Sequence, residues 1–158
     1  MKLIFLRHCE SEYNKDKTFP EKDCGLTHHG ISQAVSLKGK FKPDVVVCSC
    51  MERCKQTLLH MNIAGVPVFY NDMCREYKQD ICDYLKNESV IPENELQLLH
   101  RIGVFKDALK ALSLKRDCDI VLVVTHADFI WYFTSHEVQG ERFGTWIENG
   151  ESLELSFP

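Results

Sequence analysis

The chain has 158 residues, 44% of them apolar, which suffices for one hydrophobic core but not for two ordinary domains, so we expect a single domain over residues 1–158. Its formal net charge of −4 and pI near 6.0 give none of the Lys and Arg excess that nucleic-acid binding requires, and no nucleic-acid partner is expected. No apolar stretch reaches the roughly 20 residues of a membrane-spanning helix, and the start shows no signal-peptide pattern, which predicts a cytoplasmic protein without a membrane partner.

The first half of the chain alternates short apolar runs with helical patterns. This pattern predicts a strand at residues 3–7, a polar loop at 10–24 and a helix at 27–35 that Thr27 caps. It then predicts a buried strand at 44–49, a second helix at 51–61 and a short strand at 66–70. The last of these strands contains Pro67, which has no amide hydrogen for a β-ladder. We therefore expect it near an edge of the sheet.

The second half of the chain predicts the longest helix at residues 93–112 and a strand at 120–125. A helix at 128–136 and a last strand at 151–157 follow. A turn at Asn149-Gly150 precedes the last strand, whose residues alternate between apolar and polar. The long helix carries an apolar stripe that we expect to pack in the core: Leu96, Leu99, Ile102, Phe105, Leu109 and Leu112. This alternation of strands and helices predicts a layered α/β fold.

Eight cysteines raise the alternatives of disulfides, a metal site or free thiols. The chain has no Cys-x-x-Cys pair, and its densest group is Cys48, Cys50 and Cys54, so the close ligand pairs typical of zinc sites are missing from the sequence. A reducing compartment would keep the thiols free. We therefore expect no metal and no other cofactor.

Two histidines each follow an apolar strand, and these positions favour phosphate chemistry. Arg7-His8 ends the first strand and Thr125-His126 ends a later one, while Arg53 follows the second strand closely. The carboxyl ends of parallel strands meet at one edge of a sheet, where ligands bind. Two guanidinium groups and two imidazoles in one cleft would repel one another without an anion between them, and an imidazole can be nucleophilic at neutral pH.

Four blocks in order then resemble the signatures of the histidine phosphatase superfamily, which includes the cofactor-dependent phosphoglycerate mutases. Residues 7–14 are similar to the family's Arg-His-Gly-Glu-Ser/Thr followed by Asn, and residues 23–34 to its Asp-x-Pro-Leu-Thr-x-x-Gly-x-x-Gln-Ala. Residues 49–57 are similar to its Ser-x-x-x-Arg-x-x-Gln-Thr, and residues 125–128 to its Ser-His-Gly-Gly. The resemblance implies a three-layer α/β/α sandwich around a mostly parallel, mixed sheet. Departures include Cys9 and Gly25 in place of the family's glycine and proline, and Ala127-Asp128 in place of paired glycines.

The resemblance also implies roles for individual residues. His8 would be the nucleophile that forms a phosphohistidine, and Arg7, Arg53 and His126 would hold the phosphoryl oxygens, with Asn14 as a further phosphate contact. The general acid has two candidates. Glu76 matches the glutamate that mutase-like members place after the third strand, and Asp128 matches the acid that the acid-phosphatase branch carries after its second histidine. Either carboxyl needs a raised pKa, which neighbouring cations oppose.

Three functions remain open at this stage. The first is a metal-independent phosphatase that acts on phosphomonoesters or on protein phosphohistidine, so that its partner is a phosphorylated small molecule or a phosphoprotein. The second is a phosphoglycerate-type mutase, although only about residues 71–92 are available to cover the site. The third is a non-catalytic phosphate-binding regulatory module, which the presence of both histidines and both arginines disfavours. The sequence does not identify the substrate or the oligomeric state.

Overall fold

A five-stranded sheet forms the middle of the computed structural model, which describes residues 1–158 apart from the side chain of Arg116. The strand order is β3-β2-β4-β1-β7, with β1 at Lys2–Arg7, β2 at Val45–Cys48, β3 at Val68–Tyr70, β4 at Ile120–Thr125 and β7 at Ser152–Ser156. In this sheet order, each strand from β3 to β1 runs parallel to its neighbour, whereas β7 runs antiparallel to β1. The predicted mostly parallel, mixed sheet is confirmed, and β3 lies at its edge as Pro67 indicates.

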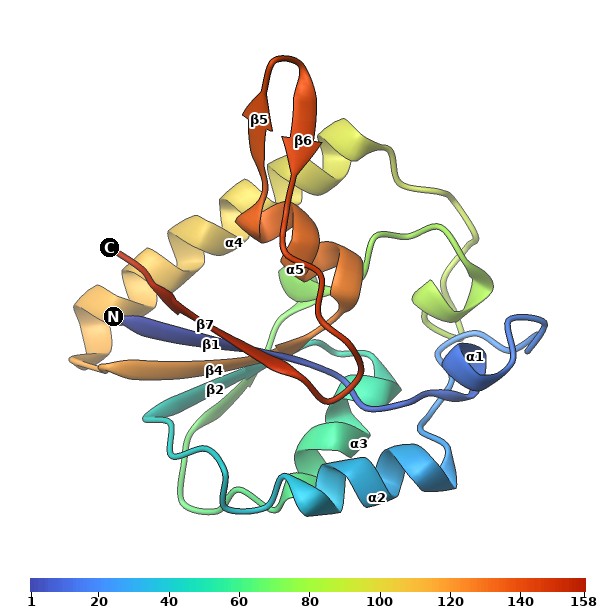
Figure 1. Cartoon of the computed structure of the whole chain (residues 1–158), viewed down its shortest axis with the longest axis horizontal. Helices are drawn as coiled ribbons and strands as arrows, with labels where there is room; N and C mark the ends of the chain where they lie inside the picture. The colour runs from blue at the N-terminus through green and yellow to red at the C-terminus, as the bar shows by residue number, and fades with distance from the viewer.

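Helices cover both faces of this sheet (Figure 1). On one face lie α2 (His28–Ser36) and α3 (Glu52–Met61), and on the other α4 (Glu95–Arg116) and α5 (Ala127–Thr134). The three-layer α/β/α architecture is therefore confirmed. No helix in the described part of the chain is both long and apolar enough to cross a membrane.

The central strands are apolar throughout because both of their faces are buried. In β4, Val121 and Val123 pack in the cluster that includes α4 and α5, whereas Leu122 and Val124 pack in the cluster with α2 and α3. Successive side chains of a strand point to opposite faces, so a doubly covered strand needs an unbroken apolar run. These two clusters hold the carboxyl ends of the strands in place.

The predicted stripe of the long helix is wrong at Leu96 and also at Leu99, which is only half-buried and belongs to neither core cluster. Leu96 is 78% exposed, and Leu98 is fully buried in its place. Leu98 shares a helix face with Ile102 and Phe105 at spacings of four and three residues, whereas Leu96 lies two positions away and so points to the other side. The helix begins later than predicted because Asn94 caps it by accepting a hydrogen bond from the Gln97 amide.

The sequence did not predict one short helix and one two-stranded hairpin. The predicted polar loop contains α1 (Glu12–Lys15), which Ser11 caps. The predicted helix ending at residue 136 instead ends at Thr134, and His136 begins a hairpin of β5 (His136–Val138) and β6 (Glu141–Phe143). Its tight turn at Gln139-Gly140 has positive φ at both residues, the backbone of a favoured two-residue hairpin loop.

Candidate active site

Strand register brings the two histidines together. In the parallel pair of β1 and β4, Arg7 lies opposite Thr125, so His8 and His126 leave the sheet side by side. The His8 amide donates to the Thr125 carbonyl at 2.9 Å, and the two imidazole rings lie 5.2 Å apart at 63°. Both rings are buried. The predicted convergence of these strand ends is therefore confirmed.

His8 is oriented as a neutral base. Its Nδ1 lies 2.7 Å from the Cys9 carbonyl oxygen, which can only accept, so Nδ1 carries the ring proton. Its Nε2 accepts a hydrogen bond from Arg53 Nε at 3.3 Å. Burial and the positive charge of Arg53 hold the pKa of His8 well below its usual range. At neutral pH, Nε2 is therefore unprotonated, and its lone pair accepts the hydrogen bond from Arg53.

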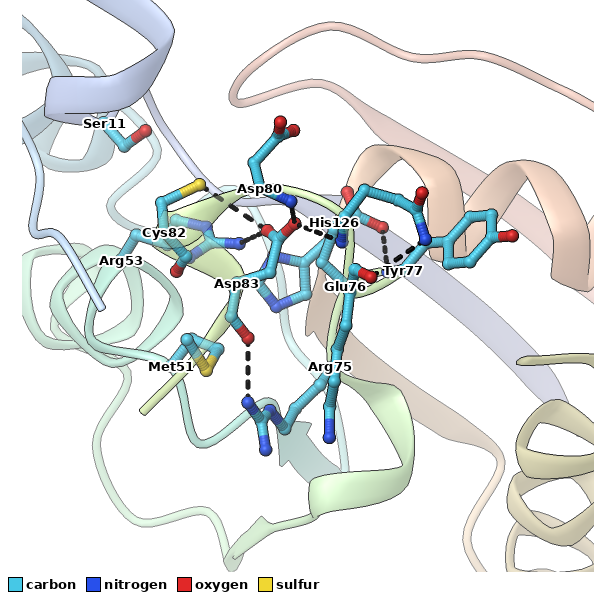
Figure 2. Close-up of polar contacts among 12 residues, drawn as sticks. Ser11, Met51, Arg53, Arg75, Glu76, Tyr77, Asp80, Cys82, Asp83 and His126 are labelled. Atoms are coloured by element: carbon cyan, nitrogen blue, oxygen red, sulfur yellow. Dashed lines mark hydrogen bonds and ion pairs between the residues drawn. The ribbon is translucent and has the colours of Figure 1, made fainter. Parts of the chain in front are cut away.

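Arg53 is fixed by the segment that covers the site, residues 71–94, called the cover segment below. The cover segment follows β3 and contains two short 3₁₀ turns, at Asp72–Cys74 and Ile81–Asp83. Arg53 Nη1 donates to the Cys82 carbonyl at 2.9 Å and Nη2 to Asp83 Oδ1 at 3.0 Å (Figure 2). The other oxygen of Asp83 accepts the amides of Gln79 and Asp80. One buried carboxylate thus ties the arginine beside the nucleophile to the backbone of the cover segment.

Arg7 and His126 each keep a buried nitrogen without a partner. Arg7 Nη1 donates to the Ile147 carbonyl, its guanidinium packs on the ring of Trp146, and its Nε is one of these nitrogens. His126 Nε2 lies 2.8 Å from Ser49 Oγ, and its Nδ1 has no hydrogen-bond partner among the described residues. An unsatisfied buried polar group costs about 1–3 kcal/mol, and Arg7 Nε, together with His126 Nδ1 if it carries the ring proton, is an unused donor beside the cavity.

Asn14 lies at the same cavity with its amide oxygen already occupied. That oxygen accepts the Ser11 amide and hydroxyl and the Nδ2 of Asn149, at 2.9–3.1 Å. These contacts fix the amide plane and leave its NH₂ group as the donor for a ligand. Asn149 also donates to the His8 carbonyl, so the turn before β7 supports the loop after β1.

Both candidate acids line the cavity. The carboxylate of Glu76 accepts the amides of Tyr77, Asp128 and Phe129, the last two at the start of α5. Burial and the negative charge of Asp128 raise the pKa of Glu76 to about 8, against the lowering effect of the Tyr77 amide and Arg53. Burial, chiefly, also raises the pKa of Asp128. The geometry brings the two acids together without choosing between them.

The cavity has a volume of about 140 Å³. Six of the seven residues predicted for the site line this cavity, and the seventh, His126, is fully buried beside His8. The sequence reasoning gave no role to several other residues of its wall. Ser11 and Tyr13 lie within the first family block, and the others lie outside the four blocks: Lys17, Asp80, Cys82, Asp83 and Trp146. Among the described residues, no group of three or more His, Cys, Asp or Glu is arranged to hold a metal ion.

Cys9 does not intrude on the cavity. Its side chain is fully buried in the cluster beneath the site, with Leu6 and Cys48 among its members, and its amide donates to Thr57 Oγ1 at 3.0 Å. Burial raises the pKa of its thiol to about 11. The replacement of glycine therefore leaves space for an anion, and the thiol stays protonated near neutral pH.

The chain matches a known protein family. A family model described as the histidine phosphatase superfamily (branch 1) matches residues 3–103. No curated protein matches the chain in sequence.

Solved structures share the fold at low identity. A putative alpha-ribazole-5'-P phosphatase from Escherichia coli is 24% identical, with a TM-score of 0.65 over 84% of this chain and 77% of that chain. Phosphoglycerate mutase from Thermus thermophilus is 20% identical, with a TM-score of 0.70 over 100% and 94%. The protein histidine phosphatase SixA, complexed with tungstate, is 16% identical, with a TM-score of 0.67 over 99% and 88%.

Proposed function

The chain belongs to the histidine phosphatase superfamily, and from that premise we propose that it is a metal-independent phosphatase that forms a phosphohistidine on His8. Its substrates are phosphomonoesters or protein phosphohistidine. The observation that carries this proposal is the state of His8, whose Nδ1 proton is held by Cys9 while Nε2 faces the guanidinium of Arg53 as a free base. A neutral imidazole beside a fixed cation suits attack on a phosphoryl group.

In the first step, His8 Nε2 attacks phosphorus and the bond from phosphorus to the leaving oxygen breaks. Arg53 Nε, which now donates to Nε2, donates instead to the arriving phosphoryl oxygen. Arg7, His126 and the Asn14 amide supply further donors, so charge on the equatorial oxygens is balanced by side chains, which makes a metal ion unnecessary.

We propose that Glu76 is the general acid of the first step and the general base of the second. With a pKa of about 8 it is protonated near neutral pH and can donate to the leaving oxygen. In the second step the resulting carboxylate takes a proton from water, and the hydroxide attacks the phosphohistidine. Inorganic phosphate leaves and Glu76 is protonated again. Asp128 is the alternative acid, because it lines the same cavity.

The small cavity favours hydrolysis over mutase chemistry. Pockets that enclose a drug-sized ligand usually measure roughly 300–1,000 Å³, and this one is about 140 Å³. Such a space encloses a phosphoryl group and leaves the rest of the substrate outside, whereas a mutase must retain its sugar acid for a second transfer. A non-catalytic module has no need for a fixed, neutral histidine in addition to its cations.

The names of two relatives indicate how broad the substrate class is. One is a putative alpha-ribazole-5'-P phosphatase and the other is the protein histidine phosphatase SixA. A phosphorylated small molecule and a phosphoprotein are therefore both candidate partners. A panel containing phosphorylated metabolites and a phosphohistidine-bearing protein would separate them.

The mechanism is tested by His8→Ala beside His100→Ala, a control on the exposed face of α4. His8→Ala should lower kcat by at least about 10³-fold, since the nucleophile is removed, whereas His100→Ala should retain wild-type turnover. Wild-type protein mixed with substrate and quenched in alkali should carry base-stable, acid-labile phosphate on the peptide containing His8. Label on another peptide, or turnover in His8→Ala, would refute the mechanism.

A further inference from the structure

Arg101, on α4, lies outside the described lining of the cavity, yet every one of its donors is used. A guanidinium group has five N–H donors, and that of Arg101 makes five hydrogen bonds. Two of them go from Nε and Nη2 to the two carboxylate oxygens of Glu93, at 2.9 and 2.7 Å. Both side chains are 11% exposed. This bidentate, nearly buried pair fixes the plane of the guanidinium group.

The other three hydrogen bonds go to the start of the cover segment. Nη1 donates to the carbonyls of Met73 and Arg75, at 2.7 and 2.8 Å, and Nη2 donates to that of Glu76 at 3.1 Å. The intervening carbonyl, of Cys74, accepts a hydrogen bond from Thr125 Oγ1 at 2.5 Å. This stretch belongs to no β-ladder, so its carbonyls depend on side chains for their partners. Arg101 supplies the partner for three of these four carbonyls.

These contacts fix the direction in which the Glu76 side chain leaves the backbone. The carbonyls of Arg75 and Glu76 belong to the two planar peptide groups on either side of the Glu76 Cα. When both planes are held, the bond from Cα to Cβ has one direction. At its other end, the carboxylate accepts the amides of Asp128 and Phe129. The Arg101 guanidinium also lies 5.8 Å from the centre of the Phe129 ring, so it contacts both places that hold Glu76.

We propose that Arg101 is a positioning residue for Glu76 and holds its carboxyl group where it meets the leaving oxygen of the substrate. Arg101 acts through Glu76 and does not contact the substrate. The catalytic effect of Arg101 rests on the proposed function, in which Glu76 is the general acid. The hold on the backbone of Glu76 does not depend on that function.

Arg101→Met is the main test, because it keeps an unbranched side chain and removes all five donors. A misplacement of about 1 Å can cost on the order of 100-fold in rate, which is the expected fall of kcat/KM on an alkyl phosphate. On p-nitrophenyl phosphate the fall should stay below about tenfold, since that leaving group needs no proton. A purely structural role would lower both substrates by the same factor, and that result overturns the proposal.

Arg142→Met is the matched control. It also removes a guanidinium group from ion pairs, but those pairs are with Glu95 and Glu137, at the start of α4 and in the β5–β6 hairpin. Arg142→Met should therefore retain wild-type turnover of both substrates. If it separates the two substrates as Arg101→Met does, the separation does not come from the hold on Glu76, and the proposal fails.

A double variant tests whether Arg101 acts through Glu76. In Glu76→Gln the acid is already absent, so adding Arg101→Met should lower kcat/KM on the alkyl phosphate by less than about threefold more. A residue that merely stabilises the fold would instead give independent losses that multiply. A further fall of about 100-fold in the double variant would therefore overturn the proposal.

Hydrogen exchange gives a readout that does not require turnover. The amides of Asp128 and Phe129 are bonded to the Glu76 carboxylate, and in Arg101→Met they should exchange at least about tenfold faster. Amides of β4 should keep their wild-type rates, which verifies that the variant is folded. Unchanged exchange at Asp128 and Phe129 overturns the hold on Glu76. If Arg101→Met does not fold, Arg101→Lys, which can make at most three of the five hydrogen bonds, carries the same comparisons.

Two outcomes separate this inference from the proposed function. Equal losses on the two substrates in Glu76→Gln refute Glu76 as the acid, and with it the catalytic effect of Arg101, while faster exchange in Arg101→Met still supports the hold on Glu76. Unequal losses in Glu76→Gln combined with equal losses in Arg101→Met leave the acid in place and refute Arg101 as its positioning residue.

Discussion

Replacing Glu76 by glutamine removes the proposed proton donor while keeping the size of the side chain. The amide oxygen of glutamine can replace Oε1 of Glu76, which accepts the amides of Tyr77 and Phe129. The Asp128 amide, which Oε2 accepts, then loses that partner. Glu76→Gln should therefore fold, at a cost in stability of about 1–3 kcal/mol. What it loses is the ability to give a proton to the leaving group.

The expected magnitude follows from the pKa of Glu76. A pKa of about 8 leaves about 90% of Glu76 protonated at pH 7, so nearly all enzyme is in the active form. General acid catalysis contributes about 10²–10⁴-fold, which is the expected loss of kcat/KM on an alkyl phosphate. The loss on p-nitrophenyl phosphate should stay below about tenfold, since p-nitrophenolate leaves without protonation.

The assay compares these two substrates over pH 5–10. Wild-type activity on the alkyl phosphate should fall as pH rises through about 8, because the acid must be protonated to act. It should show no fall near pH 6, since the pKa of His8 lies well below its usual range and the nucleophile stays deprotonated. Glu76→Gln should lose the alkaline fall together with most of its activity.

Asp128→Asn is the control for the rival acid. The negative charge of Asp128 helps to raise the pKa of Glu76, so its removal should move the alkaline fall to lower pH without separating the two substrates. If Asp128→Asn separates the substrates and Glu76→Gln does not, the acid is Asp128. If neither does, the reasoning from Glu76 fails, and a leaving group that needs little help, such as the imidazole of phosphohistidine, is indicated.

Three further outcomes are expected. Activity should survive EDTA and be inhibited competitively by vanadate, and rescue of chelated enzyme by zinc or magnesium would contradict the metal-independent mechanism. Asp83→Ala should lower the free energy of unfolding in urea by about 3–5 kcal/mol because it strands the buried Arg53, whereas Asp107→Ala on the surface of α4 should cost less than about 0.5 kcal/mol. Leu98→Ala should cost about 2–5 kcal/mol and Leu96→Ala less than about 0.5 kcal/mol; equal costs would mean that the described core face is wrong.

The part of the site that the sequence could predict lies at the ends of strands. Arg7-His8 and Thr125-His126 each stand at the carboxyl end of a buried apolar strand, and parallel strands bring their carboxyl ends to one edge of the sheet. Arg53 was predictable for the same reason, because it lies in the first turn of the helix after β2. In these places, local pattern and topology agree.

The rest depends on contacts between distant segments that leave no periodic pattern. Asp83 acquires its role only because the cover segment folds back over α3, and Trp146 only because the turn before β7 reaches Arg7. The burial of Leu98 rather than Leu96 depends on how α4 is rotated about its own axis against the sheet. The sequence does not specify this rotation, because α4 has apolar residues on more than one side.

The position of β1 also constrains how the protein is made. It is translated before both of its neighbours in the sheet, β4 and β7, which begin at Ile120 and Ser152. At 5–20 residues per second, the ribosome needs about 6–24 s to reach Ile120 after Lys2. Throughout that interval the apolar strand that leads to His8 has no native partner. A nascent chain must therefore be kept from aggregating before it can be folded, and a fragment that stops before residue 120 should never acquire the nucleophile's native surroundings.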